Sequence, residues 1–356
     1  EIDGDGLPAH VETHIVPAVA LVDDAGEVAE GCKGLVTSVV PWGWNRCLKE
    51  SLIKEGVPRE LLPDDVQLDF IREASRRETA LELLEFLHGE GGYAGGKGFI
   101  FSRESDQVAK DDQMAECGQV SDDCCTFSSV QVIPSNYRIA AHSMEEIEEF
   151  LQERGRVVLK APLSGSGKGI RFVTGELMET DRGWCRKTLQ KQGAVIVEQR
   201  MEILQEFAML FECAPVAGQT ERSVTFRGYS MFYASNGAYK GNILASNEHI
   251  ENTLTRWIPK GMLHKVQEEI ACWLQEKLQG KYTGFIGVDQ FICPHNGAIL
   301  YNPAMEINLR MTMGLIARNI YDYHKEEYAL GEGTHCFEPE RGIILLPCSG
   351  SPQTLL

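Results

Sequence analysis

A short run near residue 310 carries polar side chains that could hold a metal ion and a phosphate. In Met305–Met313, polar and apolar residues alternate without a break. Residues two apart on a β-strand share a face, so one face would carry the polar set: Glu306, Asn308, Arg310 and Thr312. Carboxylate and amide oxygens are ligands that Mg²⁺ prefers, and a guanidinium can grip a phosphoryl group or a carboxylate through two bonds. The alternative is a half-buried strand whose polar face meets water.

Asp289 adds a third oxygen donor to this region. It lies in the apolar segment Gly284–Cys293, which is predicted to be the preceding strand. The dipeptide Asn296-Gly297 between the two segments is typical of a β-hairpin turn. A hairpin would bring Asp289 beside Glu306, so the sequence predicts a metal site on two adjacent strands. Considered alone, Asp289 could also be a salt-bridged acid near a turn.

A glycine-rich segment follows the predicted strand Arg156–Lys160. Its residues are Ser164, Gly165, Ser166, Gly167, Lys168 and Gly169. Glycines let backbone amides wrap an anion, and the lysine at the end of the strand could reach the same oxygens. The segment is not a P-loop, because Pro162 stands where that motif needs glycine, and it also departs from the dinucleotide and kinase motifs. It is therefore either a loop that closes over a triphosphate or an exposed hairpin turn.

Helices and strands must position these residues, and hydrophobic periodicity predicts where they lie. The first third is expected to be a small α/β unit, with 89–98 as a glycine-rich loop and 102–130 unassigned. A capping box at Ser143 and Glu146 opens a helix. The remaining expected helices are 44–55, 64–87, 262–278 and 315–323, and the remaining strands are 16–22, 34–40, 194–197, 298–301 and 342–346.

Composition excludes several classes of function. The net charge is −18, and such an acidic surface repels phosphate backbones, so no nucleic-acid partner is expected. No apolar stretch is long enough for a membrane helix, so no membrane partner is expected either. The 11 cysteines contain no C-x-x-C pair. Reduced thiols in a cytoplasmic protein are the expected reason.

In this order, these residues resemble the ATP-grasp superfamily, which includes D-alanine–D-alanine ligase, glutathione synthetase and biotin carboxylase. The resemblance covers about residues 137–323. It implies an α/β and α+β fold, in which a pre-ATP-grasp α/β domain at 1–135 precedes two α+β subdomains that clasp ATP. The ATP-grasp domain would be 136–325, with its lid subdomain at about 140–200, and residues 326–356 would form a C-terminal tail with one strand.

The resemblance also implies a role for each candidate residue. Lys160 would contact the ATP phosphates and the segment from Ser164 to Gly169 would be the mobile loop above them. The adenine hinge would be Val195–Met201, with Glu198 accepting from the amino group and Met201 offering its backbone, and Glu206 would bind the ribose. Mg²⁺ would be held by Asp289, Glu306 and Asn308, and Arg310 would face the γ-phosphate or an acyl-phosphate.

Some family features are missing or unplaced. A second phosphate-binding lysine is usual, and only Lys110 and Arg138 are candidates for it. Gly287 stands where the family often has a cation. The run from Pro41 to Arg46, which contains Trp42 and Trp44, resembles with the helix after it a poorly characterised bacterial ATP-grasp group. Core or interface packing is the preferred interpretation of both tryptophans.

The expected activity is therefore that of an ATP- and Mg²⁺-dependent ligase, which joins a small-molecule carboxylate to an amine or another nucleophile through an acyl-phosphate and releases ADP and phosphate. The alternatives are an ATP-grasp kinase that phosphorylates a hydroxyl, and a non-catalytic nucleotide-binding module. No motif names the substrates. Many such ligases are dimers, and the assembly is open between a monomer and a homodimer.

Overall fold

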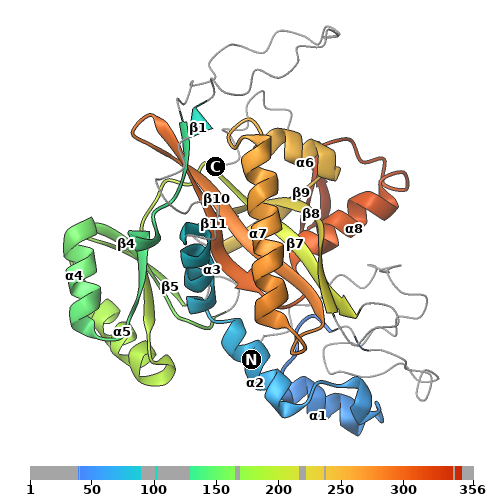
Figure 1. The fold of residues 1–356 in the computed structure, drawn as a ribbon, viewed down its shortest axis with the longest axis horizontal. Coiled ribbons are helices and arrows are strands. Elements are labelled where there is room, and N and C mark those ends of the chain that lie inside the picture. The colour runs from blue at the N-terminus through green and yellow to red at the C-terminus, as the bar shows by residue number, and fades with distance from the viewer. Residues whose placement is uncertain are drawn as a thin grey trace, which may run out of the picture.

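The computed structural model describes residues 39, 41–89, 101–102, 129–164, 169–215, 222–235, 238–339 and 341–346. Within these residues the strands form two sheets, one of nine strands (sheet A) and one of four (sheet B). Sheet B and its two helices stand beside sheet A, with helix α3 close to both (Figure 1). The mixed α/β fold expected from the sequence is confirmed in this part of the chain.

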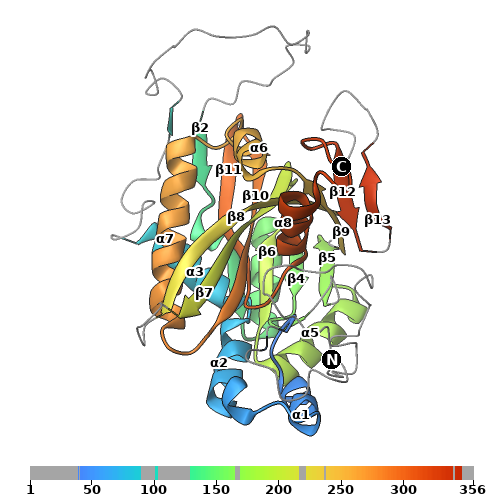
Figure 2. The same ribbon diagram turned by 90° about the vertical axis from the view of Figure 1, so that its right-hand side faces the viewer.

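Sheet A has the strand order β1-β2-β11-β10-β7-β8-β9-β12-β13. Strands β11 and β2 are parallel, and the other neighbouring pairs of strands in this sheet are antiparallel. The strands are β1 (Phe101–Ser102), β2 (Ser129–Val132), β7 (Gln205–Pro215), β8 (Arg222–Ser235), β9 (Ala238–Leu244), β10 (Gly284–His295), β11 (Ala298–Asn308), β12 (His335–Glu338) and β13 (Gly342–Leu345). In Figure 2, the helices α3 (Glu78–His88) and α7 (Lys260–Leu278) lie on one side of this sheet and α8 (Met313–His324) on the other.

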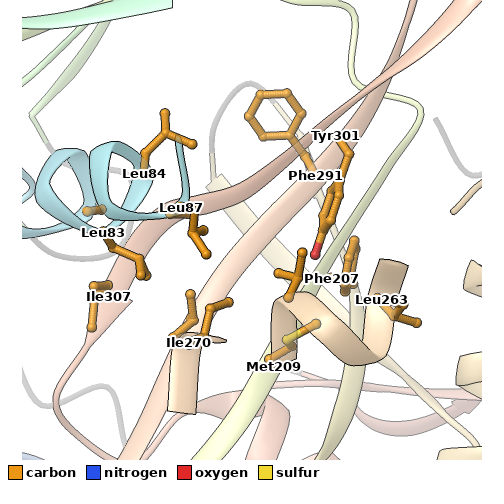
Figure 3. Packing of buried hydrophobic residues seen from close by; sticks show 14 of the residues in the cluster. Leu83, Leu84, Leu87, Phe207, Met209, Leu263, Ile270, Phe291, Tyr301 and Ile307 are labelled. Carbon is orange, nitrogen blue, oxygen red and sulfur yellow. The ribbon is translucent and has the colours of Figure 1, made fainter. Parts of the chain in front are cut away.

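The largest core lies between sheet A and the pair α3 and α7. Leucines of α3 and of α7 meet side chains of β7, β10 and β11 there (Figure 3), including Phe207, Met209 and Ile307. Helix α7 supplies its apolar residues at the spacing of one helical face, as the sequence pattern predicts. A smaller core under α8 joins β9 and β12 to residues 311–321. The helix α6 (Asn247–Leu254) follows β9 and buries Ile250 and Leu254.

Sheet B consists of β3 (Arg138–Ala141), β6 (Val195–Gln199), β4 (Arg156–Lys160) and β5 (Ile170–Thr174). The helices α4 (Met144–Arg154) and α5 (Glu179–Gln192) cover one face, where Val157, Leu159 and Val197 are buried. Because side chains alternate along a strand, Lys160 and Glu198 point to the other face. Ser143 caps α4 by accepting from the backbone of Glu146, which is one half of the predicted capping box. The Glu146 side chain accepts from the backbone of His142 instead of that of Ser143.

The first third differs from expectation in two respects. The predicted helix 64–87 is two helices, α2 (Asp65–Ala74) and α3, interrupted at residues 75–77. Helix α3 and strand β2 precede residue 135 and pack into the core of sheet A. That core therefore contains residues from both sides of the expected domain boundary. Helix α1 (Arg46–Lys54) is close to its predicted range, and a short 3₁₀ turn (Arg59–Leu61) separates it from α2.

Several other expectations can be compared with the described residues. The Asn296-Gly297 turn has positive φ at both residues, and the β-hairpin predicted there is confirmed. The tail carries two strands, β12 and β13, where one was expected. A second 3₁₀ turn (Ser135–Tyr137) leads into β3. The expected strand 16–22 lies outside the described residues, as do nearly all of the strand 34–40 and the loop 89–98.

Candidate active site

Strands β10 and β11 bring the predicted metal ligands together. Asp289 lies directly opposite Glu306 in the register, and Gly287 lies opposite Asn308. The side-chain amide of Asn308 donates to Asp289 Oδ2 at 3.0 Å, and Arg310 Nη2 donates to Asn308 Oδ1 at 2.9 Å. Two carboxylates, an amide and a guanidinium therefore meet at one corner of sheet A.

The electrostatics of this corner favour a bound cation. Burial and the nearby Glu306 carboxylate raise the pKa of Asp289 to about 7, against the opposing effects of Arg310 and Asn308. A divalent ion would offset the repulsion between the two carboxylates. The described residues contain no cluster of three or more His, Cys, Asp or Glu that could hold a metal, so a metal held by Asp289 and Glu306 would need a donor of another kind, such as the Asn308 amide. The Asn308 amide nitrogen faces Asp289 and the oxygen faces Arg310, so the amide would have to turn to bring its oxygen beside the two carboxylates. With that turn, the donor types fit Mg²⁺.

Thr312 does not lie on the strand that carries Glu306 and Asn308. Strand β11 ends at Asn308, and Thr312 is the N-cap of α8, where its side chain accepts from the backbone of Leu315. The expectation of one strand through Met313 is therefore wrong. The same threonine explains Gly287, because a Cβ there would lie 2.8 Å from Thr312 Cγ2.

Arg77 is the main site residue that sequence reasoning missed. It is 5% exposed, and its Nη2 contacts both carboxylate oxygens of Glu306, at 3.2 and 3.0 Å. Its Nη1 donates to the carbonyl of Ala161 at 2.5 Å and to Ser164 Oγ at 2.8 Å. Arg77 therefore joins the start of the glycine-rich segment to a predicted metal ligand. The only hint of this role in the nearby sequence is the pair of arginines, Arg76 and Arg77, at the break before α3.

A second chain of charges crosses sheet B. Lys160 Nζ lies 2.7 Å from Glu198 Oε2, and Arg138 Nη1 lies 3.5 Å from Glu198 Oε1. Burial acts to raise the pKa of Glu198, but the Lys160 and Arg138 cations outweigh it and lower that pKa below its ordinary value. Glu198 is therefore an anion whose two oxygens both face cations.

Arg138 also ties the two sheets together. Its side chain is fully buried and donates to the carbonyls of Ala304 at 2.6 Å and Met305 at 2.9 Å. These residues directly precede Glu306. Arg138 is thus bonded to the backbone that leads to Glu306, whereas Arg77 contacts the Glu306 carboxylate itself and Ser164 at the start of the glycine-rich segment. Lys110, the other candidate, lies outside the described residues.

The remaining predicted residues are only partly placed. Burial raises the pKa of Glu206 to about 6, and the Lys160 ammonium limits the rise, so the two side chains sense one another. Met201 is half-buried against the main core. Gly169 has a φ of 82°, and a Cβ there would lie 2.9 Å from Ser164 Cβ, so this position requires glycine. Residues 165–168 of the glycine-rich segment lie outside the described part of the chain.

Asp289 should make the stability of the metal-free protein depend on pH. Its ordinary pKa is 3.8 and its pKa in the fold is about 7, so the folded state binds more protons between these values and stability falls as pH rises through that window. Asparagine cannot titrate, so Asp289→Asn should flatten the dependence. Thermal unfolding between pH 4.5 and about 8, with a chelator present, measures both slopes. Equal slopes for the variant and the parent would contradict the raised pKa.

No family model matches the chain, and no curated protein matches its sequence. The chain is similar to the solved structure of N5-carboxyaminoimidazole synthetase from Staphylococcus aureus with ADP, at 16% identity and a TM-score of 0.35, covering 53% of this chain and 47% of that one. Biotin carboxylase from Campylobacter jejuni matches at 15% identity and a TM-score of 0.38, covering 54% and 39%. D-alanyl-alanine synthetase A from Vibrio cholerae matches at 14% identity and a TM-score of 0.35, covering 54% and 56%.

All three likenesses have 16% identity or less and TM-scores of 0.38 or less. The chain spans about half or less of the first two and 56% of the third. At these TM-scores the likeness carries no argument about residues or substrates. Those must be inferred from the site itself.

Proposed function

We propose that the chain is an ATP- and Mg²⁺-dependent ligase of the ATP-grasp type, joining a carboxylate to an amine through an acyl-phosphate. The supporting observation is a set of three cations around the Asp289–Glu306 pair: Arg77 contacts Glu306, Arg310 bonds the Asn308 amide that also bonds Asp289, and Lys160 contacts Glu198 on sheet B. Lys160 and Arg77 approach from the side of the glycine-rich segment. Arg310 lies on the other side, beside Asn308.

In this proposal the nucleotide lies between the two sheets. Glu198 and Met201 would meet the adenine, Glu206 the ribose, and Ser164 to Gly169 the phosphates. Asp289, Glu306 and Asn308 would hold Mg²⁺, which would neutralise charge on the β- and γ-phosphates. Lys160, Arg77 and Arg310 would offset the remaining charge as the γ-phosphoryl group moves.

The reaction then needs no covalent nucleophile from the protein. An oxygen of the substrate carboxylate attacks the γ-phosphorus, the bond to the β-phosphate oxygen breaks, and ADP leaves. The amine next attacks the carbonyl carbon of the acyl-phosphate, phosphate leaves with the bonding electrons, and the nitrogen loses a proton. The protein's part is to position these groups and to exclude water from the intermediate.

Substrate-dependent release of products distinguishes this ligase from its alternatives. The purified protein with Mg-ATP should release ADP and phosphate only when a pool of carboxylic acids and a pool of amines are both present. Phosphate that stays on a hydroxyl acceptor would favour the kinase. Nucleotide binding without turnover over the whole panel would favour the binding module. Lys160→Met should lower turnover with any accepted pair.

The proposal extends to partners and location. The partners would be small-molecule carboxylates and amines, with neither nucleic acid nor membrane, and a homodimer is the assembly to test. Among the described residues, no helix is both long and apolar enough to cross a membrane. The six cysteines there have free thiols, in keeping with the proposed cytoplasmic location.

A further inference from the structure

The segment Pro41–Trp44 lies directly against the residue proposed to bind the transferred phosphoryl group. The backbone N–H of Met311 donates to the carbonyl of Trp42 at 2.8 Å. A Cβ at Gly43 would lie 3.4 Å from Arg310 Cβ and 3.8 Å from Arg310 Cδ. The glycine therefore leaves the space along which the aliphatic stem of Arg310 extends.

The two tryptophans hold this segment in place from both sides. Trp42 is half-buried and packs on the α8 cluster, which includes Met311 and Ile316. Trp44 is half-buried and packs on the α1 cluster around Leu52 and Leu62, and on the main core. The preferred interpretation of the tryptophans as packing residues agrees with these contacts. The packing also fixes where Gly43 presents its backbone.

Arg310 itself is only lightly held by side chains. Among the described residues its guanidinium makes one hydrogen bond, to Asn308, and it is half-buried. A long side chain with one polar partner keeps several rotamers unless its stem is confined. The residues beside the aliphatic stem of Arg310, among them Gly43, therefore decide where the other nitrogens of the guanidinium point.

We infer that Gly43, held by the flanking tryptophans and by the Trp42–Met311 bond, is a positioning residue for Arg310. This segment from the N-terminal part of the chain would thus form one wall of the subsite for the γ-phosphate. The inference rests on the proposed function, because it assumes that Arg310 faces that phosphate. It assigns a role to Gly43, for which the sequence supplied none.

The test compares the binding of two nucleotides that differ at the γ-position. Isothermal titration calorimetry would measure Mg-ADP and the Mg complex of adenylyl-imidodiphosphate, a triphosphate analogue that is not hydrolysed. Gly43→Leu should reduce the preference for the triphosphate about tenfold, because Arg310 loses its charged contact, while ADP affinity is unchanged. Gly43→Ala should behave like the parent, since 3.4 Å is an ordinary van der Waals contact.

Two controls separate positioning from general damage. Gly261→Leu places the same side chain on α7, where a Cβ has no neighbour within 4 Å, and should leave both affinities unchanged. In an Arg310→Ala background, Gly43→Leu should cause no further loss, because a residue that acts through Arg310 has nothing left to act on. A thermal unfolding curve for each variant shows whether it is folded.

The outcomes for the inference and for the proposed function are distinct. If the parent binds neither nucleotide, the proposed function fails. If the parent binds both and Gly43→Leu keeps the triphosphate preference, or loses it equally without Arg310, the inference is overturned. A crystal structure of Gly43→Leu in which Arg310 still bonds Asn308 would also overturn the inference.

Discussion

Glu306→Gln should abolish turnover, by a factor on the order of 10³ or more, and leave the protein folded. Glutamine has the same shape and can still accept from Arg77, which now bonds both oxygens of Glu306. It lacks the charge that, with Asp289, would neutralise Mg²⁺. The initial rate with Mg-ATP and any accepted pair of substrates measures the effect, and thermal unfolding checks the fold.

The matched control is Glu276→Gln, an exposed carboxylate on α7. It changes the net charge by the same amount far from the proposed metal site, and turnover should stay close to that of the parent. If Glu306→Gln turned over at the parent rate, Glu306 would have no place in the metal site. The three-donor interpretation would then fail with it.

Arg138→Met should lower the free energy of unfolding by about 3–5 kcal/mol. The Arg138 side chain is fully buried, and its removal would leave the carbonyls of Ala304 and Met305 without their charged donor. Glu198 would lose one of the two cations that hold it ionised, although Lys160 would remain. Denaturant titration of the parent and the variant measures the difference.

Arg186→Met is the matched control, because it breaks an ion pair at the surface. Arg186 and its partner Glu179 are 58% and 79% exposed, so solvent screens the pair and its loss should cost less than about 1 kcal/mol. Equal destabilisation by the two variants would show that Arg138 does not brace the sheets. A loss of nucleotide affinity in folded Arg138→Met would further link the brace to the hinge at Glu198.

Glu306 and Arg138 belong to one continuous set of contacts. Lys160 contacts Glu198, Glu198 contacts Arg138, and Arg138 holds the backbone that leads to Glu306. Arg77 then joins Glu306 to the carbonyl of Ala161, the residue after Lys160. The set runs through both sheets and returns to its start. A change at one member is therefore expected to reach the others.

Local sequence predicts the parts of this site that local structure positions. Strand alternation and an Asn-Gly turn predict that Asp289 and Glu306 lie on one face of the same hairpin. The register at the turn would pair Asp289 with Ala304, and a register shift between Asp289 and Phe291 brings it opposite Glu306 instead. The ends of β4 and the cap of α4 follow from similar short-range rules. The same rules placed Thr312 on the strand. They failed there because alternation of apolar residues does not show where a helix cap interrupts a strand.

The sequence by itself thus determined that Asp289, Glu306 and Asn308 come together on one hairpin, since spacing along a strand is set by nearby residues. Only the tertiary structure decided which distant cations join them. Arg77 and Glu306 are 229 positions apart, and Arg138 and Met305 are 167 apart. No periodicity spans such distances. Those contacts arise from the packing of α3 and sheet B against sheet A, where buried polar groups must find partners.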